Sequence, residues 1–268
     1  MKQTHIERQF AAMGARFRIA EYIANRFAVN ANYSVDIRKD RRGEFFVLNV
    51  PHHLREAMEV VVLQKEAADR HLLLLVKRVD RKEKDRFLCG HDERSWFVAA
   101  VPGNASTVFQ AKEALKPFEV RSAQSAARIS ARKRNHRNNS AFRRQGEWFF
   151  VPAPDLSVNS KFILRNEPIR RGSGKAHIVQ EAYRTGGETV YVHRKYPNGV
   201  TKEEYKKILE RGGTRMGEWN VMVRNAWVYA RGEIRHPDHK TITLHGWHRV
   251  LMNTENRTRS MANMAFLD

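Results

Sequence analysis

The most regular pattern of apolar and polar residues lies between Val228 and Asn253, where the two kinds alternate. Alternation of this kind predicts strands, here over residues 228–235, 240–244 and 247–252. Pro237 and Asp238 separate the first two strands and favour a tight turn, because proline presets φ and aspartate can bond to its own backbone. We therefore expect a hairpin whose turn holds His236 and His239 close together.

The pattern up to residue 120 predicts a mixed domain. Apolar residues recur every three or four positions over 3–26, a spacing typical of an amphipathic helix. Residues 54–70 are ambiguous, because helix formers flank a β-branched centre. A short helix is expected over 106–115, capped by Ser106 or Thr107. Apolar runs bounded by turn residues predict strands over 33–37, 43–50, 71–78, 86–89 and 95–101.

A second domain is expected from residue 144 onward. Strands are predicted over 146–154, 161–164 and 189–193, and Pro197-Asn198-Gly199 favours a turn. Residues 201–211 are typical of a helix that opens with the capping box Thr201…Glu204.

The predicted fold class is therefore α+β, with two domains. Residues 1–120 form an N-terminal α+β domain, residues 121–143 a basic linker, and residues 144–268 a β-rich domain that contains histidines. We expect this C-terminal domain to be a mainly antiparallel sheet or partial barrel.

Charge adds an expectation about partners. The chain has 49 Lys and Arg against 29 Asp and Glu, a formal net charge of +20. Such a field attracts polyanions, of which nucleic acid is the commonest in a cytoplasm, although an acidic protein would also satisfy it. No apolar run is long enough to span a membrane, no secretory signal is recognised and the single cysteine cannot form an intrachain disulfide. A cytoplasmic protein without a membrane partner is expected.

The segment 121–144 has the most concentrated charge, with eight Lys or Arg and no acid. It contains almost no large apolar residue, so we expect a partly disordered tether, or a helix that forms only against a partner. Arginine-rich segments commonly contact phosphates, because each guanidinium can donate two parallel hydrogen bonds. Cations predicted to bind nucleic acid are Arg121, Arg128, Arg132, Lys133, Arg134, Arg137, Arg143, Arg144, Arg170, Arg171 and Lys175.

The last three of these flank a glycine turn, Gly172-Ser173-Gly174, that superficially resembles a phosphate-binding loop. The glycines are too close together for a P-loop, and Ala176 stands where Ser or Thr is needed. No nucleoside triphosphate site is predicted. Six aromatic residues could stack on unpaired bases, although most of them are expected in the core: Trp148, Phe149, Phe150, Trp219, Trp227 and Trp247.

Histidines supply the candidate chemistry. Six lie between His177 and His248, including the H-x-x-H pairs His236/His239 and His245/His248. Imidazoles at this density could bind a divalent metal such as zinc, or could cleave RNA by general acid–base catalysis. They could equally cap turns without doing chemistry, and strand alternation could send His245 and His248 to different faces.

The C-terminal half resembles an uncharacterised family of bacterial β-rich proteins. The resemblance rests on Arg144-Gln145-Gly146-Glu147, on Gly174 to His177, on His236 to His239, and on Leu244, Gly246 and Trp247. It implies no reaction, but it singles out His177, His236 and His239 as a trio. Glu147 and Lys175 depart from the expected pattern, where Asp and a further His would stand.

The predicted function is nucleic-acid binding, with RNA favoured over DNA, as a subunit of a ribonucleoprotein or nucleoprotein complex that can include other proteins. The alternative is a histidine-dependent ribonuclease or metal-dependent hydrolase centred on His177, His236 and His239. No cofactor is required by the first function, whereas the second allows a divalent metal.

Overall fold

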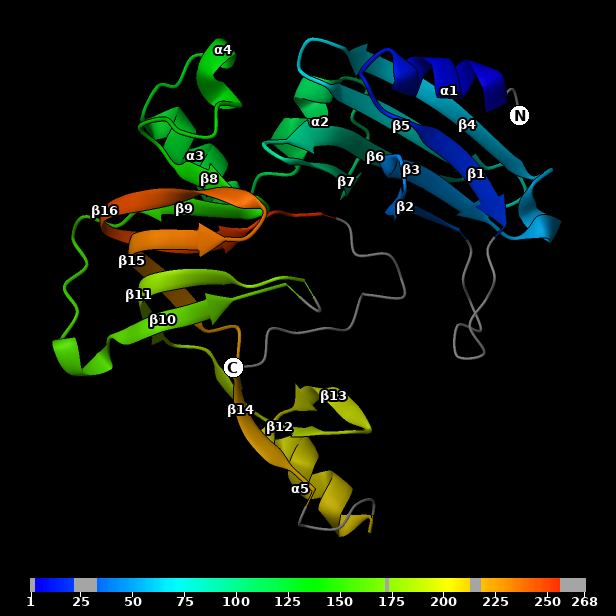
Figure 1. Cartoon of the computed structure of the whole chain (residues 1–268). Helices are drawn as coiled ribbons and strands as arrows, with labels where there is room; N and C mark the ends of the chain where they lie inside the picture. Colours follow the sequence, from blue (N-terminus) through cyan, green and yellow to red (C-terminus); the bar gives the residue numbers. More distant parts are fainter. Residues whose placement is uncertain (1–2, 22–32, 172–173, 213–217, 256–268) are drawn as a thin grey trace. The chain divides into compact units, whose positions relative to one another are not determined.

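The computed structural model describes residues 3–21, 33–171, 174–212 and 218–255 (Figure 1). They divide into two compact units, Met1–Ser140 with the segment that starts at Asn253, and Ala141–Met252. The chain is 18% helix and 51% strand, with several antiparallel sheets, which confirms the α+β class. Within the described residues, no helix has the length and apolar character needed to cross a membrane.

The first unit contains two sheets. The three-stranded sheet has the order β1-β3-β2, with β1 parallel to β3, and the four-stranded antiparallel sheet has the order β4-β5-β6-β7. The strands are β1 (Phe17–Glu21), β2 (Ser34–Asp40), β3 (Gly43–Val50), β4 (Met58–Glu66), β5 (His71–Arg78), β6 (Glu83–Asp92) and β7 (Ser95–Val101).

Residues 72–76 of strand β5 are all apolar because both faces of the strand are buried there. Leu72 and Leu74 pack in the same cluster as helix α1 (Gln3–Ala11) and the three-stranded sheet. Leu73 packs in a second cluster with helix α2 (Val108–Ala114), on the opposite face. The predicted cap at Thr107 is present, as a capping box with Gln110.

The long helix predicted over residues 3–26 was wrong. Helix α1 ends at Ala11, and Gly14, with φ of +80°, lies between it and β1. Phe17 keeps its apolar environment in the strand, where its ring stacks on Phe10 at 4.6 Å. Residues 22–26 lie outside the described residues. The ambiguous segment 54–70 is mainly strand β4, so its β-branched centre decided the outcome.

The predicted basic linker contains helices instead of a disordered tether. Helix α3 (Phe118–Ala126) and helix α4 (Ala131–Arg134) occupy much of it. Two buried polar side chains hold the segment: Lys116 Nζ and Gln124 Nε2 both donate to the carbonyl of Arg134, at 2.8 and 2.6 Å. Because the segment lacks large apolar residues, composition predicted a partly disordered tether or a helix that forms only against a partner, and it did not predict this polar anchor within the chain.

The second unit is built on a six-stranded sheet in the order β10-β11-β15-β16-β9-β8, antiparallel throughout. Ile169 lies in β10, at one edge of this sheet, and Trp148 lies in β9, near the other edge, yet both side chains belong to one buried cluster. The sheet therefore curls around its core, and the described strands do not form a closed barrel. Its strands are β8 (Arg143–Gln145), β9 (Trp148–Pro152), β10 (Leu164–Ile169), β11 (His177–Thr185), β15 (Trp227–His236) and β16 (His239–Met252).

Two details of this sheet differ from the prediction. The strands predicted over 240–244 and 247–252 form the single strand β16, which continues through Gly246 at φ of +81°. The strand predicted over 161–164 is a 3-10 turn at Ser160–Phe162, followed by β10.

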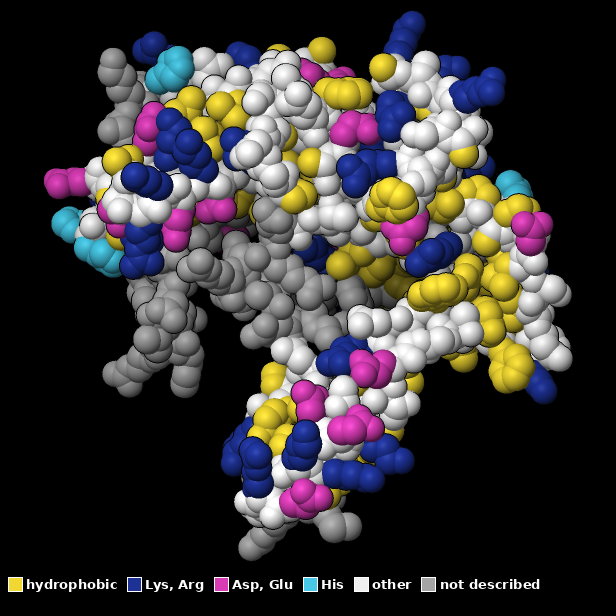
Figure 2. Space-filling view, turned by 180° about the vertical axis from the view of Figure 1, so that it is seen from behind, with side chains coloured by type: hydrophobic (Ala, Val, Ile, Leu, Met, Phe, Trp, Pro, Cys, Tyr) yellow, Lys and Arg dark blue, Asp and Glu magenta, His cyan; other side chains and the backbone are white. Residues whose placement is uncertain are grey.

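A small insertion separates β11 from β15. Its three-stranded sheet has the order β13-β12-β14, from β12 (Glu188–His193), β13 (Tyr196–Val200) and β14 (Asn220–Arg224), with helix α5 (Lys202–Glu210). Helix α5 has the predicted capping box at Thr201. The predicted turn at 197–199 was wrong: it lies within β13, where a Cβ on Gly199 would be 2.6 Å from Val190. Lys and Arg mix with Asp and Glu over this insertion (Figure 2).

Candidate metal centre

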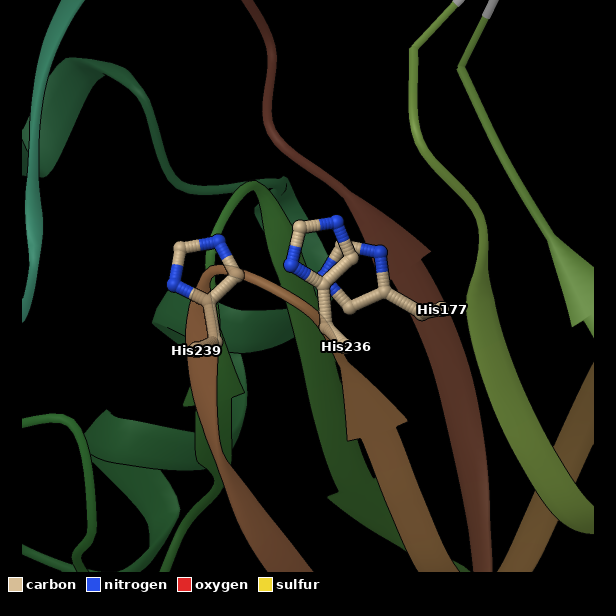
Figure 3. Close-up of side chains that lie close together, drawn as sticks. All are labelled: His177, His236 and His239. Atoms are coloured by element: carbon tan, nitrogen blue, oxygen red, sulfur yellow. The ribbon is translucent and has the colours of Figure 1, made fainter.

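Three strand ends bring three histidines together. His236 ends β15 and His239 begins β16, and the two are paired across the predicted turn. His177 begins β11, and the neighbouring pair Ile178–Arg235 places it beside His236. Figure 3 shows the three imidazoles gathered at this end of the sheet.

The three rings lie face to face. Ring centroids are 4.1 Å apart for His177 and His236, 4.6 Å for His236 and His239, and 5.6 Å for His177 and His239. The interplanar angles are between 21° and 30°. One nitrogen from each ring lies within 4.8 Å of the others, so the set could hold a metal ion.

His177 is the most deeply buried of the three, with 1% of its surface exposed. Among the described residues, neither ring nitrogen has a hydrogen-bond partner. Burial, with smaller effects from His236 and His239, lowers the pKa of His177 to about 3. The ring is therefore neutral at physiological pH, with a buried lone pair that a cation could satisfy.

The rim of the trio is charged. Lys175 Nζ donates to both carboxylate oxygens of Asp238, at 2.8 Å each, and this contact lowers the pKa of Asp238. The backbone N–H of Asp238 donates to Nδ1 of His236 at 3.1 Å. Burial lowers the pKa of His236, while the charges of Asp238 and Glu147 oppose that shift.

The turn between β8 and β9 supports the site in a way that the residue pattern did not predict. Gln145, 1% exposed, donates from Nε2 to the carbonyls of Ile234 at 3.2 Å and Lys240 at 2.7 Å. It thus joins both strands of the histidine hairpin just below His236 and His239. The available signal was a polar residue next to a glycine, three positions before the aromatic strand that begins at Trp148.

Gly146 supplies space. Its φ is +57°, and a Cβ there would lie 2.9 Å from Nε2 of His239 and 3.3 Å from Nε2 of His177. Both nitrogens therefore lie against the backbone of Gly146, in space that any side chain at this position would fill.

The substitution Gly146→Ala is expected to lower zinc affinity, because its methyl group would fill this space and displace the His239 ring. The left-handed backbone adds about 1 kcal/mol of destabilisation. Zinc titration and chemical denaturation measure the two effects separately. Gly246→Ala is the matched control, since Gly246 has φ of +81° but nothing within 4 Å of its Cβ position. Equal zinc affinity in both variants would contradict the prediction.

Three imidazoles are suitable ligands for a zinc ion, but the histidine rotamers in this structure do not direct their nitrogen lone pairs to a common point. Tetrahedral zinc with Zn–N of 2.0–2.1 Å needs nitrogens about 3.3 Å apart. Imidazole lone pairs lie in the ring plane, so the stacked rings must turn about their Cβ–Cγ bonds before they converge. Since Nδ1 of His236 accepts a hydrogen bond, coordination through Nε2 would also move a proton to Nδ1 and release Asp238 N–H.

The other predicted residues lie apart from the trio, except Lys175. His245 is exposed on β16 while His248 is buried, so the second H-x-x-H does not converge. Within the basic segment, Arg134 pairs with Glu113, Arg137 with Asp92 and Glu93, and Arg143 donates to the carbonyl of Thr243. Exposed cations of the predicted set are Arg121, Arg128, Arg132, Lys133, Arg170 and Lys175.

Arg144 and Arg171 are partly buried. The glycine turn predicted near them falls on residues 172–173, which lie outside the described residues.

Acid is expected to destabilise the metal-free second unit. His177 takes up a proton near its ordinary pKa of 6.5 when unfolded, but only near 3 when folded. The unfolded state therefore binds more protons between these values, and the free energy of unfolding falls by about 2 kcal/mol between pH 7.5 and pH 5. Denaturation at both pH values tests this. His177→Phe should remove most of the slope, whereas exposed His245→Phe should keep it; an unchanged slope in His177→Phe would exclude His177 as its source.

Comparisons of the chain with protein-family models, with curated proteins and with solved structures gave no match.

Proposed function

We propose that the second unit binds a divalent transition metal, zinc in preference, through His177, His236 and His239, and that it acts as a metal-dependent hydrolase. The observation that carries the proposal is His177, a buried neutral imidazole with no hydrogen-bond partner in the part of the chain that the structure describes, next to two further imidazoles. Buried polar groups normally have partners, and such exceptions are frequent at functional sites. Imidazole is a preferred ligand of zinc.

Three protein ligands would leave a fourth position for water, as in catalytic zinc sites. A bound zinc ion lowers the pKa of such a water to about 7 and so supplies hydroxide at neutral pH. His236 and His239 are only partly buried, which gives a substrate access. The exposed ammonium of Lys175 at the rim could leave Asp238 to neutralise an anionic substrate, and the carboxylate of Glu147 could accept a proton.

The first experiment is metal analysis of the purified protein by mass spectrometry, with zinc titration after chelation. About one zinc ion per chain, lost in His236→Ala, would support the proposal. Phosphodiester hydrolysis is then assayed with and without metal. A chain that binds zinc, cobalt and manganese no better than His236→Ala would overturn the metal centre, and zinc binding without hydrolysis would limit it to a structural role.

A second candidate function, nucleic-acid binding with RNA favoured, is supported by charge on the first unit. Arg121, Arg128, Arg132 and Lys133 are exposed on and between helices α3 and α4. No acidic residue lies in the sequence between them. Such a cluster favours phosphate contacts, which could hold a subunit of a ribonucleoprotein or present a substrate.

Removing part of this cluster should weaken RNA binding in a salt-dependent way. For Arg132→Ser with Lys133→Ser, we expect the slope of log affinity against log salt to become shallower by about 1.4, since each of the two single-stranded phosphate contacts contributes about 0.7. Arg55→Ser with Arg81→Ser removes the same charge from exposed positions elsewhere in the first unit. Equal slopes for the two double variants in filter binding would show that only net charge matters.

A further inference from the structure

The outer face of the curled sheet carries aromatic rings that the core does not use. Residues 227, 229 and 231 of β15 share this face, because side chains alternate along a strand. Tyr229 pairs with Tyr183 of β11 on one side and with Arg249 of β16 on the other. The core cluster instead uses Ala182, Ala230 and Val250, which point to the opposite face.

Arginines lie over the aromatic rings of this face. The guanidinium of Arg249 is 4.8 Å from the ring of Trp227. That of Arg231 is 4.7 Å from the ring of Trp247, which is only 7% exposed and therefore does not offer its own face to a base. The rings of Tyr183 and Tyr229 lie side by side, with centroids 6.2 Å apart at 29°. Trp227 is 54% exposed, which is unusual for a tryptophan on a folded sheet.

The charge of the face is complementary to a polyanion. The acid at the centre of this face, Glu181, forms ion pairs with Arg165 and Arg231. Its negative charge is therefore compensated. Arg249 places a further guanidinium beside Trp227. Aromatic rings that alternate with arginines on an open sheet provide stacking for bases and pairing for phosphates.

We infer that this outer face, made by Trp227, Tyr229, Tyr183, Arg231 and Arg249, binds single-stranded nucleic acid by stacking unpaired bases. The inference rests on the proposed nucleic-acid binding and gives it a strand preference, because duplex bases cannot reach the rings. The inference does not depend on the metal centre. The pair Thr185–Trp227 lies at one end of β11 and β15, and the histidine trio lies at the other end of these strands.

The test is binding of fluorescein-labelled oligouridylate, oligodeoxythymidylate and a duplex of equal length, measured by anisotropy near physiological salt. Trp227→Ala is expected to weaken single-strand binding about tenfold, as the loss of one stacked base does. Trp227→Phe keeps a ring and should restore most of the affinity. Quenching of tryptophan fluorescence by the single strands should disappear in part in both variants.

Phe162→Ala is the matched control, because Phe162 is 56% exposed and has Lys161 over its ring, but lies outside this face. Equal affinities of Trp227→Ala and Phe162→Ala, duplex binding as tight as single-strand binding, or no binding at all would each overturn the inference. Tighter binding of oligouridylate than of oligodeoxythymidylate would support it with RNA as the ligand, and the reverse with DNA. Zinc content, measured on the same samples, reports separately on the metal centre, and the Arg132/Lys133 variant on the phosphate contacts.

Discussion

Zinc is expected to bind His236→Ala about one hundredfold more weakly than the unsubstituted protein. Structural zinc sites have apparent binding free energies of roughly 10–16 kcal/mol, shared among about four ligands, so one ligand contributes about 3 kcal/mol. His236 lies between the other two rings, at 4.1 Å from His177 and 4.6 Å from His239, so its loss leaves the remaining pair without the central donor. Competition with a chromophoric chelator measures the change.

The matched control is His245→Ala, which removes an exposed imidazole from the same sheet. It should bind zinc as tightly as the unsubstituted protein. His177→Phe adds a second test, because the buried ring forms no hydrogen bond with any described residue that phenylalanine would break. It should fold with equal or higher stability in the absence of metal and lose zinc binding. Zinc affinities within threefold across all four proteins would contradict the metal centre.

Glu113→Ala is expected to destabilise the first unit by about 3 kcal/mol. Glu113 pairs with the ammonium of Lys116, which is 3% exposed, and with Arg134 at 3.2 Å. Removing one partner of a buried pair leaves the other charge uncompensated, which typically costs 3–5 kcal/mol, and the partial exposure of Glu113 places the effect at the lower end. Chemical denaturation followed by circular dichroism measures the loss.

Glu59→Ala breaks an ion pair of similar length, 3.0 Å to Lys77, between side chains that are 51% and 30% exposed. Its expected loss is below about 1 kcal/mol. Because Lys116 also holds the carbonyl of Arg134, Glu113→Ala should expose helix α4 to proteolysis before the sheets unfold. Equal losses of stability in the two variants would show that burial of Lys116 does not matter.

The strands of the fold could largely be predicted from the residue pattern, since alternation and turn residues are local signals. Strand β3 begins and ends at the predicted residues, as do β5 and β7. The ends of helices were harder to predict from the sequence where a single glycine determines them, as Gly14 does after helix α1. The ordered conformation of the segment that contains α3 and α4 depends on hydrogen bonds from Lys116 and Gln124 to the carbonyl of Arg134, and no local pattern of residues reveals these bonds.

The same distinction applies to the site. The proximity of His236 and His239 follows from a two-residue turn, so the sequence alone predicts it. His177 is far from them in sequence, and only the family resemblance singled it out with them. The roles of Gln145 and Gly146 depend on β8 and β9 reaching the histidine hairpin through the curl of the sheet, which is a property of the assembled fold.

The insertion has a consequence for how this chain can be re-engineered. Thr185 and Trp227 are paired neighbours in the sheet, so the backbone leaves and re-enters the six-stranded sheet at a single point. A short reverse turn could join these two residues and delete everything between them without changing a hydrogen bond at the histidine end. This position is therefore suited to domain insertion: a foreign binding module or a fluorescent reporter could replace the β12–α5–β14 element, while the histidines at the far ends of the strands keep their positions.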